Sequence, residues 1–400
     1  MLPTPPSREG QLGFLYVPPY RVQGISVAGE QTVIQIPELD LVFDMGQCTR
    51  ASLSSPTVAL SHAHMDHLGG LPYWFSQRYF QKIGGETHMP DRADGKPRVP
   101  VGRCVCHPEL EPHLRAMMRA WEPLERQRTP FEIVALAPES DLEIKNNILL
   151  RAVATKHTVP SLGFAVLERR SKLKEEYRDL PQEMLRDLRS RGTEITRMVD
   201  IPLIAYTGDT APGEYLVRDE FADAKIMIAE CTFFEPDHGD RARTGMHLHI
   251  DDIIRMLPVW KAEAIVLVHA SRRTTIHYAR ERIEALAGAD AARIHLLMDH
   301  RTNRMRYEQQ VAVAQATADE TARRKSGIVN PEVDPSTAQT NEALHQPSEA
   351  LSQPSEALSQ PSEALSQPSE ALSQPSEALS APTHETDESQ VSADVESPSS

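Results

Sequence analysis

Cysteine and long hydrophobic runs are both scarce in this 400-residue sequence. The four cysteines, at irregular spacing, argue against a disulfide framework and favour reduced thiols. No run approaches the roughly 18 apolar residues of a membrane-spanning helix, and residues 1–10 lack the apolar core of a signal peptide. The composition therefore predicts a cytoplasmic protein that does not associate with a membrane.

Basic residues are absent from the last part of the chain. No Lys or Arg follows residue 325, whereas 13 Asp and Glu lie between residues 331 and 400. The net charge of −15 is concentrated in this segment, since residues 1–330 carry 42 basic against 44 acidic side chains. Because the body of the chain is close to neutral, the acidic net charge does not exclude a polyanionic substrate.

A seven-residue repeat, Gln-Pro-Ser-Glu-Ala-Leu-Ser, occurs five times between residues 346 and 380. Each repeat contains a proline, which removes a backbone donor and clashes with the preceding helical turn, and only one large apolar side chain. Neither a helix nor a coiled-coil seam can form from such units. We therefore expect residues 326–400 to be a disordered acidic tail, whose binding partner the sequence leaves unknown.

The rest of the chain alternates between two hydrophobic patterns. Short runs rich in β-branched residues predict strands, and stretches with helical spacing lie between several of them. The predicted strands are 32–36, 41–43, 57–60, 148–154, 201–205, 226–229 and 265–268, and the predicted helices are 72–83, 108–121, 181–190, 250–261 and 275–286. This order favours an α/β sandwich of two sheets covered by helices, in one domain over residues 1–310.

Polar residues follow several of the predicted strands. His62 and His64 come after one strand, and His157, Asp209, Glu230 and His269 each come after another. Layered α/β folds build their sites just beyond the ends of strands, so these side chains are candidates for one site.

Four ligand-type residues are crowded into His62-Ala63-His64-Met65-Asp66-His67. Alternate residues share one face of an extended segment, so His62 and His64 can approach one ion. Asp66 and His67, on the turn into the next helix, can face a second ion beside it. Imidazole and carboxylate ligands suit Zn²⁺, with Mn²⁺ or Fe²⁺ as weaker candidates. A surface cluster or a hydrogen-bonded core histidine would explain any one of these residues, but not all four together.

This His-x-His-x-Asp-His motif resembles the signature of the metallo-β-lactamase fold. The resemblance implies a four-layer αββα sandwich with two metal ions, for which His157, Asp209 and His269 match the remaining ligands in the family's order. It also implies that Asp44, in Asp-Met-Gly, supports the ligand loop without binding metal.

The finer resemblance is to ribonuclease Z, the tRNA 3′-processing endonuclease, in its short plant-type form. The matching stretches are Gly69-Gly70-Leu71-Pro72, Tyr206-Thr207-Gly208-Asp209-Thr210, Glu230-Cys231-Thr232-Phe233 and Met246-His247-Leu248-His249. The resemblance implies a homodimeric, zinc-dependent endoribonuclease that removes 3′ trailers from tRNA precursors by two-metal phosphodiester hydrolysis. Glu230 and His247 would form the pair that orients and protonates the leaving oxygen, and Asp66 would accept a proton from the nucleophile.

RNA must also be held away from the metals. Residues 169–200 contain nine Lys or Arg against seven acids, and Lys172 and Lys174 are candidates for phosphate contacts. Arg272 and Arg273, after His269, are two more candidates. Composition alone fits a solvated helical hairpin with paired charges equally well. The sequence lacks the long Gly/Pro-rich arm that most bacterial ribonuclease Z chains use to bind the tRNA elbow.

Two other functions fit parts of the pattern. A small-molecule hydrolase, such as a phosphodiesterase or lactonase, could use the same metal site, although Glu230 and His247 favour phosphodiester chemistry. A non-catalytic RNA-binding protein would leave buried carboxylates and imidazoles without a use. Cys104-x-Cys106-His107 lacks a second ligand pair and is interpreted as structural, and His249 is a candidate to support the site from behind the ligands.

Overall fold

Two β-sheets pack face to face in the computed structural model, which describes residues 12–81 and 101–325. The first sheet has the order β1 (Gly13–Val17), β2 (Tyr20–Ala28), β3 (Gln31–Ile36), β4 (Leu41–Phe43), β5 (Thr57–Ala59), β6 (Arg103–Cys106) and β7 (Glu132–Ala135), with β14 (Ala270–Ser271) paired to β2. The second has the order β15 (Ile294–Leu296), β13 (Ala264–Val268), β12 (Ile226–Glu230), β11 (Thr196–Tyr206), β10 (Leu162–Leu173), β9 (Ile148–Ala154) and β8 (Asp141–Lys145).

Strand directions bring the predicted site residues to one edge of each sheet. Strands β4 to β7 run parallel, with Phe43 opposite Ala59 in the β4–β5 register. Strands β11, β12, β13 and β15 are also parallel, and β9 shares their direction because β10 is antiparallel to both β9 and β11. The carboxyl ends of these strands therefore lie together, which is where the polar residues follow them.

The space between the sheets is filled by alternate residues of both. Ile204 and Tyr206 of β11 face the first sheet, where the ring of Phe43 packs against Tyr206 and against Phe164 of the neighbouring strand β10. Ala205, between them in sequence, faces the outer side. The side-chain period of two in an extended strand thus lets β11 pack on both faces.

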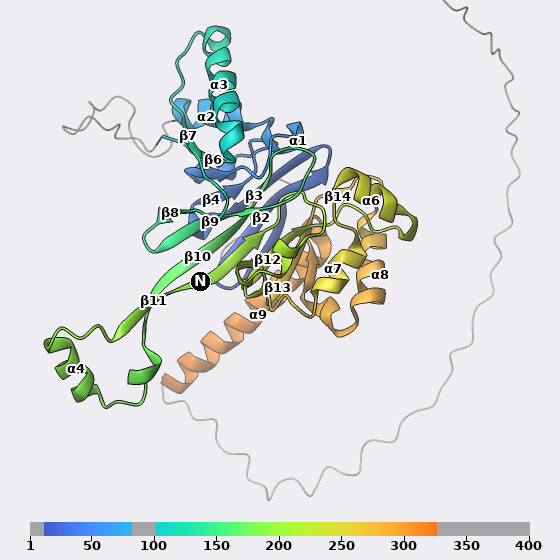
Figure 1. Cartoon of the computed structure of the whole chain (residues 1–400). Helices are drawn as coiled ribbons and strands as arrows, with labels where there is room; N and C mark the ends of the chain where they lie inside the picture. The colour runs from blue at the N-terminus through green and yellow to red at the C-terminus, as the bar shows by residue number, and fades with distance from the viewer. Residues whose placement is uncertain (1–11, 82–100, 326–400) are drawn as a thin grey trace, which may run out of the picture. The chain divides into compact units, whose positions relative to one another are not determined.

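Helices cover the outer face of each sheet, which completes a four-layer αββα sandwich (Figure 1). The first sheet is covered by α2 (Leu71–Phe80) and α3 (Glu111–Glu125), whose Trp74 and Leu114 pack against it. The second is covered by α5 (Asp219–Ala222), α7 (Ile250–Met256) and α8 (Ile276–Ala287), through Phe221, Ile253 and Ile283. Short helices α1 (Met65–Leu68) and α6 (Gly239–Gly245) lie in connections. The predicted layer architecture is confirmed.

The charged segment 169–200 forms an arm. Beyond Glu168, β10 pairs only with β11 among the described strands. The two strands continue as a two-stranded ladder that carries α4 (Gln182–Ser190) away from the sandwich (Figure 1). The ladder pairs Leu173 with Thr196 at its far end. An arm is therefore present although the Gly/Pro-rich sequence is missing. The alternative of a helical hairpin differs from the structure in the two strands, whereas the predicted helix 181–190 corresponds to α4.

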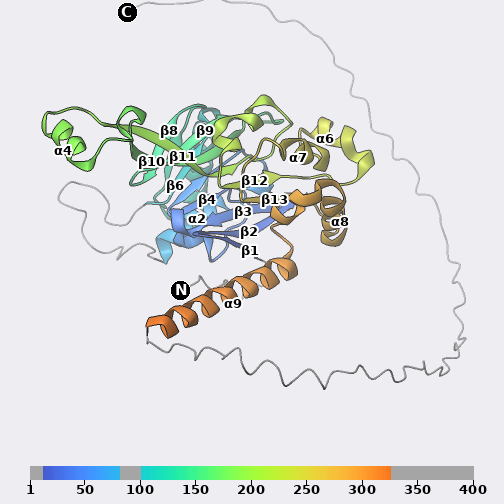
Figure 2. The same cartoon turned by 90° about the horizontal axis from the view of Figure 1, so that it is seen from below.

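Helix α9 (His300–Lys325) was not predicted, and it continues past residue 310, where the expected domain ended. It passes beside β1 (Figure 2), where Tyr307 packs edge-on against Phe14 and Tyr16. The predicted tail, residues 326–400, lies outside the described residues. No helix in the described part of the chain is long and apolar enough to cross a membrane.

Candidate metal centre and catalytic site

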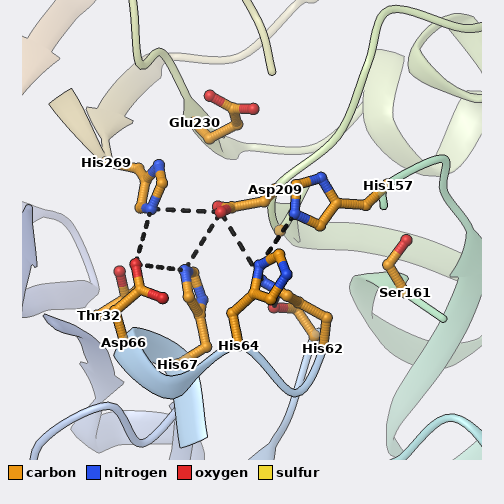
Figure 3. A network of polar contacts seen from close by, with 12 residues as sticks. Thr32, His62, His64, Asp66, His67, His157, Ser161, Asp209, Glu230 and His269 are labelled. Atoms are coloured by element: carbon orange, nitrogen blue, oxygen red, sulfur yellow. Dashed lines mark hydrogen bonds and ion pairs between the residues drawn. The ribbon is translucent and has the colours of Figure 1, made fainter. Parts of the chain in front are cut away.

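Seven predicted ligands come together beyond the carboxyl ends of four strands and on α1 (Figure 3). His62 and His64 follow β5, and Asp66 and His67 lie in the single turn of α1. The other three lie in separate connections: His157 after β9, Asp209 after β11 and His269 directly after β13.

Three histidines form one half of this centre. The Nε2 atom of His62 lies 3.0 Å from Nδ1 of His64, and Nε2 of His157 lies 3.2 Å from the same Nδ1 atom. The three nitrogen atoms converge on one point from two connections, as the ligands of a single ion would.

Asp66, His67 and His269 form the other half, with Asp209 between the halves. The Oδ2 atom of Asp209 lies 3.3 Å from Nε2 of His67, 3.2 Å from Nε2 of His269 and 3.8 Å from Nε2 of His62. The Oδ2 atom of Asp66 lies 3.4 Å from Nε2 of His269. Figure 3 shows Asp209 joined by these contacts to both groups of histidines, which is the position of a bridging ligand.

Asp44 fixes the ring orientation of two ligands from behind. Its Oδ2 atom accepts hydrogen bonds from Nδ1 of His67 at 2.8 Å and from the hydroxyl groups of Ser61 and Tyr206. Because the Ser61 hydroxyl donates to Asp44, it accepts from Nδ1–H of His62, 2.9 Å away. Both histidines are therefore held through Nδ1–H and turn Nε2 toward the centre.

Glu230 has the matching role on the other side. Its Oε1 atom accepts from Nδ1 of His247 at 3.1 Å, and its Oε2 atom accepts from the Thr232 hydroxyl at 2.9 Å. Since that hydroxyl donates to a carboxylate, it must accept from Nδ1–H of His269, also at 2.9 Å. One buried carboxylate thus orients His247 directly and His269 through Thr232.

The charge states at the centre favour bound cations. Burial lowers the pKa of His62, His64 and His157, which keeps their nitrogen lone pairs free. Burial alone would raise the pKa of Asp66 and Asp209, but neighbouring histidines, His269 foremost, hold both carboxyl groups well below their usual range. These are the protonation states in which such groups bind metal. His67 differs, because the carboxylates of Asp209 and Asp44 outweigh its burial and raise its pKa well above its usual value. A bound cation would displace that proton and take the place of its charge.

Two buried atoms give a second test of whether a metal fits. Nε2 of His67 and Oδ1 of Asp209 are buried, and neither has a hydrogen-bond partner among the described residues. Leaving such atoms unpaired costs about 1–3 kcal/mol each. A divalent cation would satisfy both, so the donor set and its geometry fit a divalent metal centre.

His247 differs from the ligands in its protonation. Burial would lower its pKa, but the carboxylate of Glu230 outweighs this and raises the pKa to about 9. The imidazolium form therefore predominates at neutral pH, with Nδ1–H held by Glu230 and a second proton on Nε2. His247 stacks on His269 and lies edge-on to His157, with ring centroids 5.3 and 5.1 Å apart, so this proton donor adjoins both halves of the centre.

A glycine next to the ligand loop allows a close approach of two chain segments. A Cβ atom on Gly46 would lie 1.8 Å from the carbonyl oxygen of Asp66, and one on Gly70 would lie 2.5 Å from the backbone nitrogen of Cys48. The loop therefore packs directly on the backbone after Asp44. This close approach, more than a tight turn, explains the glycine at position 70.

The other predicted residues lie away from the metal cluster. Lys172 and Lys174 are on the arm, where Lys174 faces Glu194 at 3.9 Å. Arg272 and Arg273 are exposed in the loop before α8, and Arg272 lies 3.8 Å from Glu30.

Three further residues belong to the structural surroundings of the site. His249 caps α7 by accepting from the Asp251 backbone and donates to the carbonyl oxygen of Glu235. Cys104 and Cys106 are buried in β6 against α2 and α3.

Ser61, Tyr206 and Thr232 are the functional residues that the sequence did not single out. Each touches a carboxylate that orients ligands. Ser61 directly precedes a ligand, and the other two lie within stretches that had been matched to the family, so chain adjacency was the available signal. Their roles depend on hydroxyl geometry that residue spacing does not reveal.

Comparison with known proteins gives sequence relatives that are named tRNase Z or ribonuclease Z. A chloroplastic tRNase Z of Arabidopsis thaliana, TRZ2, is 29% identical over 279 residues, which cover 69% of this chain and 74% of the relative. A nuclear ribonuclease Z of Triticum aestivum is 32% identical over 180 residues, which cover 45% of this chain and 93% of the relative.

Among solved structures, the short form of human tRNase Z aligns with a TM-score of 0.43 at 17% identity, over 66% of this chain and 93% of that chain. No protein-family model matches the sequence. The identity to the wheat protein over nearly its whole length, together with the four-layer sandwich, shows that the chain is a member of the ribonuclease Z family of metallo-β-lactamase-fold hydrolases.

Proposed function

We propose that this protein removes 3′ trailers from tRNA precursors by hydrolysing one phosphodiester bond, with two Zn²⁺ ions in the centre. The observation that carries the proposal is the Glu230–His247 pair beside the seven-ligand cluster. Hydrolysis of a phosphodiester releases an alkoxide, and a proton donor beside the metal cluster would protonate that leaving oxygen.

The proposed ligands divide between two ions. His62, His64 and His157 would hold one ion and Asp66, His67 and His269 the other, with Asp209 shared. Bound divalent metals supply a water nucleophile at neutral pH and positive charge for the phosphate oxygens.

The chain's own groups complete the reaction. His247, positively charged at neutral pH, would deliver its Nε2 proton to the leaving 3′ oxygen, which gives the tRNA product a free 3′ hydroxyl. Glu230 holds the ring in place for this transfer. Asp66 is kept ionised by His269 and is held by a 2.8 Å hydrogen bond from the Gly29 backbone, and it would take up the proton of the attacking water.

The arm is the proposed grip on the body of the tRNA. Its outer part is polar and exposed. Lys172, Arg186 and Arg189 have no ion-pair partner among the described residues, whereas the other basic side chains of the arm form ion pairs. Basic side chains without an ion-pair partner, on an element that projects from the sandwich, can contact successive phosphates of an RNA backbone. Such contacts position the RNA without reading its sequence. Arg272 and Arg273 would contribute contacts nearer the metals.

Homodimerisation is part of the same proposal. Tyr73 and Phe80 on α2 and Trp121 and Leu124 on α3 are exposed, with Leu124 72% accessible. The two helices lie side by side, since Ser76 contacts Glu125. Large apolar side chains gathered on two adjacent helices are typical of a protein–protein interface.

The cellular location of the protein is a further part of the proposal. We expect the cytoplasm, although the relatives include chloroplastic and nuclear proteins.

A parallel assay tests the proposed function. The zinc-loaded protein and an Asp66→Ala variant are incubated with a labelled tRNA precursor that carries a 3′ trailer, and separately with bis(p-nitrophenyl) phosphate. We expect the wild type to release the trailer and Asp66→Ala to lose this activity. Hydrolysis of the small diester without trailer release would make the protein a small-molecule phosphodiesterase, and no cleavage of either would support a binding function.

A further inference from the structure

Helices α8 and α9 enclose a groove of about 730 Å³ on the outer side of the second sheet. It is lined by His277 and Arg280 of α8 and by Arg301, Thr302, Arg306 and Gln309 of α9. No carboxylate is among its lining residues. The chemistry of this lining is that of a site for an anion.

The positive charge of the groove is only partly balanced. Arg280 lies 3.2 Å from Asp299, and His277 lies 3.3 Å from Glu281. Arg301, in contrast, has no ion-pair partner within residues 12–81 and 101–325, and it is exposed. One guanidinium group is therefore free to meet a ligand that enters the groove.

Arg306 is a second unbalanced charge, and it is half-buried. Its side chain hydrogen-bonds to Nε2 of His295, at 2.7 Å, and its buried Nε–H has no hydrogen-bond partner in the described part of the chain. His295 cannot balance it, because burial and the Arg306 charge lower the pKa of that imidazole to about 4. A desolvated guanidinium without a carboxylate is costly unless an anion approaches it.

The groove is also rigid on its α9 side. Asn303 donates to the carbonyl oxygens of Leu296 and Leu297, and Tyr307 packs on β1 through Phe14. These contacts hold the opposite face of the helix, so Arg301 and Arg306 project from a fixed element. A preformed pair of guanidinium groups suits a phosphate, which they can bind through two parallel hydrogen bonds each.

The chain path connects the groove to the metal centre. Helix α8 begins at Ile276, seven residues after the proposed ligand His269, and the exposed Arg272 and Arg273 lie between them. Thr274 anchors this connection by donating to Glu235 at 2.7 Å. His277 and Arg280, which line the groove, lie in the first turns of helix α8.

We propose that the groove between α8 and α9 binds a backbone phosphate of the RNA substrate outside the metal centre. This inference rests on the proposed function, because it takes RNA as the source of the phosphate. Free phosphate has the same chemistry, and the experiment has a separate arm for it.

The test uses the full-length, zinc-loaded protein and a tRNA precursor with a phosphorothioate at the cleavage point, which slows hydrolysis. Binding is measured over a range of salt concentrations for the wild type, Arg301→Gln and Arg301→Lys. The matched control is Arg304→Gln, which removes the same charge from the same helix at a side chain that is 80% exposed and paired with Glu308, outside the groove. Thermal unfolding of each variant checks folding.

We expect Arg301→Gln to bind the RNA several-fold more weakly and to reduce the slope of log affinity against log salt by about one, the effect of losing one phosphate contact. Arg301→Lys should keep most of the slope, and Arg304→Gln should match the wild type. An Arg301→Gln variant with the slope of the control, or with a higher RNA affinity, would overturn the proposal. Calorimetric binding of inorganic phosphate that is lost in Arg301→Gln without any change in RNA binding would overturn it too, in favour of free phosphate.

The two levels of inference fail differently. Trailer release by the wild type with an unchanged slope for Arg301→Gln refutes the groove alone. A reduced slope with no trailer release refutes the proposed reaction and leaves the phosphate site standing.

Discussion

Replacing Thr232 by Val removes the hydroxyl that connects Glu230 to His269, at almost constant side-chain volume. In the wild type this hydroxyl donates to Oε2 of Glu230 and accepts from Nδ1–H of His269, both at 2.9 Å. Glu230 keeps other donors, including the backbone of Leu248 at 2.9 Å and His247 at 3.1 Å. The loss therefore falls mainly on His269.

The expected cost follows from the burial of these groups. Thr232 and His269 are 4% and 2% exposed, so water cannot replace the lost acceptor. Leaving a buried Nδ1–H unpaired costs about 1–3 kcal/mol. At about 1.4 kcal/mol for each factor of ten, this corresponds to a roughly 5- to 150-fold lower affinity for the metal that His269 would bind. An effect of this size is in line with that of removing partners behind metal ligands.

Competition with a chromophoric chelator measures this effect, and Thr232→Ser is the matched control because it keeps the hydroxyl. We expect two classes of metal site in Thr232→Val, one with wild-type affinity and one weakened, whereas Thr232→Ser should bind both ions almost as the wild type does. Equal affinities in the Val and Ser variants would refute the orientation of His269 through Thr232.

Three other changes test the neighbouring parts of the site. In Glu230→Gln, the pKa of His247 should fall from about 9 toward its ordinary 6.5. The protonated form of His247 is the acid, so cleavage persists at pH values below this pKa and is lost as the pH rises through it. The alkaline limb of the pH–rate profile should therefore move to lower pH in this variant. Asp44→Asn should lower the free energy of unfolding by about 3–5 kcal/mol in denaturant titrations, because it removes the buried carboxylate that His67 contacts at 2.8 Å; an unchanged midpoint would contradict the role of Asp44. Gly46→Ala should lower the free energy of unfolding by about 1–3 kcal/mol or more, since the added Cβ would lie 1.8 Å from the carbonyl oxygen of Asp66. Gly239→Ala is the control, because no atom lies within 4 Å of its added Cβ, and it should leave the melting temperature unchanged or slightly raised.

The sandwich could be predicted because it rests on local patterns, and the candidate ligands could be singled out from their positions after strands and from the family motif. Apolar runs at 32–36, 148–154 and 226–229 correspond to strands β3, β9 and β12. The sequence alone shows where a predicted strand is followed by a ligand-type residue. Parallel strand pairing then brings the carboxyl ends of neighbouring strands together. The seven predicted ligands meet for that reason.

Other elements were missed because their patterns are weak or their stability comes from partners far away in sequence. Strand β10 (Leu162–Leu173) is apolar at its start and charged at its end, since only its first half lies between the sheets. Helix α9 has a polar composition, and its first turns are held by Asn303 and Tyr307 against β15 and β1. The predicted helix 250–261 ends at Met256, where the chain turns toward the buried Trp260. Tertiary contacts decided these boundaries, and periodicity does not encode them.

The central claim is metal-dependent cleavage of a tRNA precursor at the start of its trailer. The most direct test is to map the ends of both products after incubation of a 3′-extended precursor with the zinc-loaded wild-type protein and with the same protein after chelation. We expect the zinc-loaded protein to form a tRNA with a free 3′ hydroxyl and a trailer with a 5′ phosphate, and the chelated protein to form neither product. An intact precursor under both conditions, or products with a 3′ phosphate, would contradict the claim.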